Sequence, residues 1–133
     1  MSTSDAQPYT LEKTLETLRE VVEEKGDAYI YPGSDVMEGC WYADDDGNPS
    51  CLVGHVIQRL DPEVFQQVVD FERQNSRSEA AINIESIILG GRRVFAKDAL
   101  VALQSAQARQ DEGQNWGAAL YAAENLGSDA PMY

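Results

Sequence analysis

The sequence predicts an α+β domain in which a small antiparallel β-hairpin packs against four to six helices. Over most of the chain, apolar residues recur at a spacing of three and four, which is typical of amphipathic helices that face a core. One region departs from this pattern, because residues 27–32 (DAYIYP) and 40–43 (CWYA) are rich in residues that favour strands. Turn residues separate the two stretches, so we expect them to pair as the hairpin.

The first predicted helix covers residues 10–25. Thr10 is a favoured N-cap, and Gly26 is a residue that commonly ends a helix. The apolar stripe that would face the core consists of Leu11, Leu15, Leu18 and Val22.

Two further helices are predicted from a repeated start signal. Asn48-Pro49 and Asp61-Pro62 each place a favoured N-cap before a proline, which loses nothing at the first helical position. The signals predict helices over 49–60 and 62–73. Gly54 lies inside the first of them, where glycine costs about 1 kcal/mol relative to alanine, so we expect a close backbone contact at that position.

The C-terminal half is predicted to contain a tight antiparallel pair of alanine-rich helices over 96–110 and 115–126. Residues 80–89, with the run INIESIIL, fit a helix or a strand, and 92–95 fit a short added strand. We expect one globular domain over 10–127, with flexible ends at 1–9 and 128–133.

Composition indicates a cytoplasmic protein without a membrane partner. Hydrophobic residues make up 43% of the 133 residues, and no apolar run approaches the roughly 20 residues of a membrane span. Residues 1–8 lack the basic and apolar regions of a signal peptide. Free thiols are expected for Cys40 and Cys51, although the two are also able to pair as a disulfide.

The charge is strongly acidic and unevenly distributed. Asp and Glu number 23 against ten Lys and Arg, for a formal net charge of −13. Residues 26–58 contain six acids and no base, whereas 73–97 contain five bases and two acids. Such a field disfavours direct binding to nucleic acid and to anionic membranes, and it favours basic partners. The alternative explanation is that the acidic charge serves only to keep the protein soluble.

Both cysteines and the only histidine fall within residues 40–55, which opens an enzymatic alternative. Cys40, Cys51 and His55 are ligand types for zinc, with an aspartate from 44–46 as the fourth ligand, although the spacing is not that of a standard zinc site. A thiol enzyme would use Cys51 in the first turn of a helix, where the dipole lowers a thiol pKa. The simpler interpretation makes both thiols and the imidazole structural.

Asp44, Asp46 and Asn48 alternate like the opening of a calcium loop. The match ends there, because Gly47 is not at the sixth position and His55 replaces the final glutamate. We therefore expect no metal and no cofactor.

Two segments, CWYADDDGNPSCLVGHVIQRL (40–60) and AQARQDEGQNWGAALYAAE (106–124), resemble parts of small uncharacterised proteins of actinobacteria and their phages. The resemblance implies a phage or mobile-element context and carries over no activity.

The function expected from the sequence is that of a non-enzymatic acidic interaction protein, phage-encoded if the resemblance holds, which binds a basic surface of a partner protein. A narrower form is a nucleic-acid mimic, whose carboxylates imitate phosphates. The alternative is a small thiol- or zinc-dependent enzyme centred on Cys51 and His55. The expected partner-binding side chains lie on the outward face of the predicted hairpin and are Tyr31, Tyr42, Asp44, Asp45 and Asp46.

Overall fold

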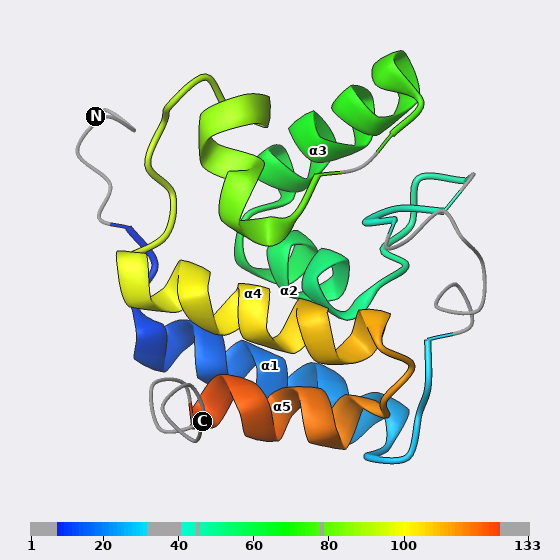
Figure 1. Ribbon diagram of the computed structural model, residues 1–133. Coiled ribbons are helices and arrows are strands. Elements are labelled where there is room, and N and C mark those ends of the chain that lie inside the picture. Colours follow the sequence, from blue (N-terminus) through cyan, green and yellow to red (C-terminus); the bar gives the residue numbers. More distant parts are fainter. Residues whose placement is uncertain (1–7, 32–40, 45, 78, 126–133) are drawn as a thin grey trace.

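The computed structural model describes residues 8–31, 41–44, 46–77 and 79–125, and within these ranges the fold is helical (Figure 1). None of the helices in these ranges is long and apolar enough to cross a membrane. In chain order the elements are α1 (Leu11–Lys25), α2 (Leu52–Leu60), α3 (Pro62–Asn75), the 3₁₀ turn η3 (Ala81–Asn83), the π-helical turn η4 (Ile84–Ile88), α4 (Lys97–Asp111) and α5 (Trp116–Glu124).

The helices α4 and α5 form the predicted antiparallel pair, and α1 packs against both of them and against α2 (Figure 1). Both helices bury several alanines, and such small side chains allow helix backbones to approach closely. The buried apolar residues form a single cluster, whose largest fully buried members are Leu18, Tyr42, Leu52, Ile57, Ile84, Phe95, Leu103 and Trp116.

The predicted hairpin is wrong, and with it the α+β class, because the described residues contain no β-strand. The reason lies in competing partners for the backbone. The carbonyl groups of Asp27 and Tyr29 accept hydrogen bonds from Gly117 N and Trp116 N at the start of α5, at 2.9 and 2.8 Å. Residues 41–43 pair with 49–51 instead, through one isolated antiparallel bridge between Ala43 and Pro49. Cys40 lies outside the described residues.

The two helix-start signals have different outcomes. Asp61 caps α3 as predicted, because its Oδ1 accepts a hydrogen bond from Val64 N at 3.2 Å. The cap predicted at Asn48 is wrong: α2 begins at Leu52, and Cys51 is its N-cap, with Sγ accepting from Gly54 N at 3.4 Å. The first helix agrees with the prediction, with Thr10 as its cap.

Residues 81–88 adopt the helical alternative, as the 3₁₀ turn followed by the π-helical turn. The buried carboxylate of Glu85 accepts hydrogen bonds from Val94 N and Phe95 N, at 2.6 and 2.7 Å, and so ties the following segment to η4. The strand that was predicted at 92–95 is reduced to one parallel bridge between Tyr9 and Phe95.

Two buried glutamines on α4 connect this helix to η3 and to α2. Gln107 Oε1 accepts from Ala81 N at 2.7 Å, and Gln110 Oε1 accepts from Leu52 N at 2.9 Å. Gln110 thereby satisfies one of the free amide groups at the start of α2. It also fixes the end of the 41–51 segment to the C-terminal end of α4.

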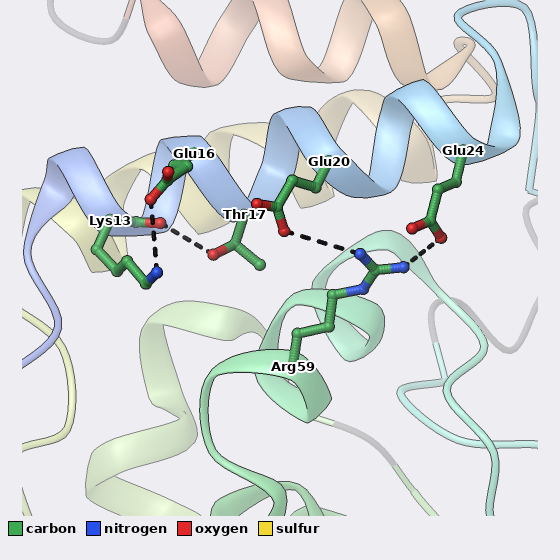
Figure 2. Close-up of polar contacts among 6 residues, drawn as sticks. All are labelled: Lys13, Glu16, Thr17, Glu20, Glu24 and Arg59. Carbon is green, nitrogen blue, oxygen red and sulfur yellow. Dashed lines mark hydrogen bonds and ion pairs between the residues drawn. The ribbon is translucent and has the colours of Figure 1, made fainter.

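A surface ion-pair cluster joins α1 to α2 (Figure 2). Arg59 lies between Glu20 and Glu24, pairing with Glu20 at 3.9 Å and hydrogen-bonding to Glu24. The hydrogen bond from Arg59 lowers the pKa of Glu24 below its ordinary value. These two glutamates therefore already have an intramolecular cation.

Candidate functional site

The acidic turn is the segment Asp44–Asn48, and hydrogen bonds join its described residues. Asp44 Oδ1 accepts hydrogen bonds from Asp46 N and Asn48 N, both at 2.9 Å, while Asp44 N donates to the carbonyl of Asn48 at 2.9 Å. Gly47 has a positive φ of 87°, which glycine adopts without strain. Asp44 and Asp46 are exposed, and Asp45 lies outside the described residues. The hydrogen bonds thus hold the backbone at Asp44 and Asp46, whose carboxylates are exposed.

A buried carboxylate on α3 holds the segment that leads into this turn. Glu72 is 4% exposed, and its two oxygens accept from Tyr42 N at 2.8 Å and Ala43 N at 3.2 Å. A carboxylate that accepts backbone amides makes stronger hydrogen bonds than a neutral group. Glu72 therefore fixes the position of the acidic turn relative to α3.

The glycine inside α2 provides the second fixed contact. A Cβ built at Gly54 would lie 2.2 Å from the carbonyl oxygen of Tyr42, a distance at which backbone atoms must shift. The close backbone contact predicted at this glycine is therefore present, although its partner belongs to a bridge-containing loop and not to a hairpin strand.

Tyr31 and Tyr42 are buried, so neither of these two predicted binding residues offers its ring to a partner. The Tyr42 hydroxyl donates to the carbonyl of Glu79 at 2.6 Å and accepts from Gln107 Nε2 at 2.7 Å. The Tyr31 hydroxyl shares a hydrogen bond with Ser50 Oγ at 3.1 Å. Both tyrosines support the acidic segment from the interior.

An open pocket of about 480 Å³ adjoins the acidic turn. Trp41 and Val69 supply apolar wall, and Asp44, Glu72 and Arg73 supply charged groups. The full lining is Trp41, Ala43, Asp44, Val69, Glu72, Arg73 and Ser76. Such a volume lies in the range of small-ligand and side-chain sites.

The geometry of Cys51 and His55 does not resemble a thiol–imidazole catalytic pair. The Cys51 side chain is buried, and its Sγ accepts from Gly54 N. His55 Nδ1 lies 2.9 Å from the carbonyl oxygen of Cys51, which only accepts, so Nδ1 carries the proton and donates. The ring packs edge-on against Trp116, with 5.6 Å between centroids. The contacts of both residues therefore stabilise the N-terminal part of α2.

No group of three or more His, Cys, Asp and Glu residues is placed to hold a metal ion within the ranges that the structure describes. One residue of the zinc hypothesis, Cys40, falls outside them.

Burial of His55 makes stability depend on pH. Burial lowers the pKa of His55 below its ordinary value of 6.5, and the hydrogen bond to Cys51 opposes only part of this effect. The unfolded chain therefore gains its proton first as the pH falls, so the contribution to stability is complete above about pH 6.5 and declines below it. In urea titrations we expect the free energy of unfolding to fall as the pH is lowered below about 6.5, and to fall less in His55→Gln. Equal declines in the two proteins would contradict this assignment.

Glu72, Trp41 and Arg73 are the site residues that the sequence analysis missed. Glu72 carried a signal, because it continues the inward spacing of Phe65, Val68 and Val69 on α3. A carboxylate at such a position is a candidate for a buried acceptor of backbone amides. Trp41 and Arg73 carried no comparable signal.

In comparisons with known proteins, the chain matches no family model, no curated protein and no solved structure. Function is therefore argued from the geometry of the acidic turn and its surroundings.

Proposed function

We infer that this chain is a non-enzymatic protein that binds a basic surface of a partner protein through the acidic turn. The observation that carries the proposal is the combination of exposed Asp44 and Asp46 carboxylates with a backbone fixed by Glu72 and by the Tyr42–Gly54 contact. A surface that is already ordered loses little conformational entropy on binding.

The charge around the turn supports a cationic partner. No lysine or arginine occurs between Gly26 and Gln58. Among the described residues Arg73 also approaches the turn, because a Cβ built at Gly47 would lie 3.3 Å from its Nη2. The neighbouring pocket, with Trp41 on its wall, would accept the stem of a long basic side chain whose charge lies near Asp44.

The test is parallel affinity capture with three forms of the protein from an actinobacterial lysate. The wild type is compared with a turn variant, in which Asp44, Asp45 and Asp46 become asparagine. Asparagine keeps a side-chain oxygen at position 44, so the hydrogen bonds from Asp46 N and Asn48 N remain possible. The control variant replaces three exposed glutamates elsewhere, Glu12, Glu23 and Glu63, with glutamine. Glu20 and Glu24 are unsuitable for it, since they pair with Arg59.

A basic protein retained by the wild type and the control variant, and lost from the turn variant, is the expected result. Equal retention by all three forms would assign the acidic surface to solubility alone. If the retained protein binds DNA and DNA displaces it, the narrower role as a nucleic-acid mimic follows.

A further inference from the structure

A group of exposed cations lies on the connection between η4 and α4. Arg92, Arg93 and Lys97 are exposed, and none of them forms an ion pair with a carboxylate of the described residues. This is unexpected in a chain with 23 acids and ten bases, where a carboxylate is rarely distant. Arg19, Arg59 and Arg109, by contrast, each pair with glutamate.

Exposed apolar side chains accompany these cations. Ile82 on η3, Ile87 on η4 and Val101 on α4 are 44%, 45% and 36% exposed. Ile82 N donates to Gln104 Oε1 at 2.9 Å, which places η3 against the stretch of α4 that carries Val101. Val101 lies one helical turn beyond Lys97, on the same face of α4. We call this surface, made of Ile82, Ile87, Arg92, Arg93, Lys97 and Val101, the basic end.

The acidic turn lies at the opposite end of the molecule. The basic end leads into the N-terminus of α4, whereas the segment with the acidic turn is fixed to the C-terminal end of α4 by the Gln110–Leu52 hydrogen bond. Along α4, Lys97 and Gln110 are separated by roughly 20 Å, so the cations of the basic end lie far from the acidic turn, although Ile82 lies near the middle of the helix. Figure 1 shows the yellow-green connection and the teal segment on opposite sides of the fold. This separation exceeds the Debye length of about 8 Å at physiological ionic strength, so the two surfaces do not neutralise each other within one copy.

We propose that the basic end docks onto the acidic-turn end of a second copy of this chain. Arg92 and Arg93 face Asp44 and Asp46 of the neighbouring copy, and the exposed isoleucines lie against the half-buried Trp41 that lines its pocket. The occupant is a second copy because the chain itself carries the complementary charges, the exposed carboxylates of Asp44 and Asp46, beside a pocket that the half-buried Trp41 lines.

The placement of the two surfaces determines the type of assembly. Each contact uses the basic end of one copy and the acidic turn of another and leaves one surface of each copy free, so we expect a heterologous contact that propagates from copy to copy. The net charge of −13 on each copy makes the copies repel one another, which opposes growth of the assembly and keeps the association weak. Binding of an external basic partner at the acidic turn would compete with this contact. If the protein stays monomeric but its acidic turn captures such a partner, self-association is wrong and the proposed function stands. The two proposals are therefore separable.

The test is sedimentation equilibrium on the purified full chain from micromolar to millimolar concentration. The weight-average mass of the wild type should rise steadily above the 14.7 kDa of one chain, without a plateau at the dimer. The basic-end variant, Arg92→Glu with Arg93→Glu, and the acidic-end variant, Asp44→Asn with Asp46→Lys, should each remain monomeric. A control with the same change in net charge as the basic-end variant, Lys13→Glu with Arg109→Glu, should associate like the wild type.

Mixtures of singly defective chains give the decisive result. The acidic end of the basic-end variant is intact, and so is the basic end of the acidic-end variant, so an equimolar mixture of the two should form a one-to-one pair that stops growing. A wild type that stays monomeric, a closed dimer that survives both pairs of substitutions, or a mixture that does not associate would each overturn the proposal.

Discussion

Replacing Glu72 with alanine is expected to lower the free energy of unfolding by about 3 kcal/mol or more. The substitution removes the acceptor of two buried backbone amides, Tyr42 N and Ala43 N, and hydrogen bonds to a charged group contribute about 1.5–3 kcal/mol each. The two donors would remain buried without their acceptor, and a cavity would add to the loss. Urea denaturation followed by circular dichroism measures the change.

The matched control for this variant is Asp70→Ala, which removes an exposed carboxylate from the same helix and should stay within about 0.5 kcal/mol of the wild type. Glu72→Gln keeps one carbonyl oxygen and should lie between the two. Similar small effects of Glu72→Ala and Asp70→Ala would show that the carboxylate does not hold the acidic segment.

Gly54→Ala is expected to destabilise the fold by about 2 kcal/mol, against the gain of about 1 kcal/mol that helix propensity alone predicts. The sign reverses because the new Cβ would lie 2.2 Å from the carbonyl oxygen of Tyr42. The obstacle is backbone, so relief requires movement of α2 or of the segment with the acidic turn. Thermal and urea unfolding measure the effect.

Gln58→Ala serves as the control, because Gln58 is exposed on the same helix and its replacement should change stability little. Gly54→Ala should also weaken capture of the basic partner in the protein that remains folded, since the turn is displaced. A stabilised Gly54→Ala protein would rule out the close contact.

Local signals predicted the helices well where no distant group competed for the backbone. Asp61-Pro62 opens α3 as expected, but the same signal at Asn48-Pro49 does not open α2. The Asn48 carbonyl, which would accept the first hydrogen bond of a helix that Asn48 capped, accepts from Asp44 N instead, and Pro49 pairs with Ala43. The start of α2 is then set three residues later, by Gln110, which accepts the amide of Leu52 from 58 residues away. No short window of sequence contains that partner.

The sequence predicts the exposed aspartates of the candidate site but not the positions of its tyrosines. Asp44 and Asp46 are exposed in a turn, as a run of aspartates before a proline indicates. Tyr31 and Tyr42 were assigned outward positions from the alternation of a two-stranded hairpin, and without that hairpin the rings pack into the core. The packing of whole helices decides the hydrogen-bond partners of the two hydroxyls, which are Gln107 for Tyr42 and Ser50 for Tyr31.

The most direct test of the central claim is the rate at which the purified partner associates with this protein. The rate is measured for the wild type, the turn variant and the control variant, at low and at high salt. If the acidic turn recognises a basic surface, the turn variant associates more slowly at low salt than the control variant of equal net charge. The difference should shrink toward about 0.5 M salt, where the screening length falls to about 4 Å. Equal rates for the two variants at low salt would contradict the claim and leave the turn as ordinary solvated surface.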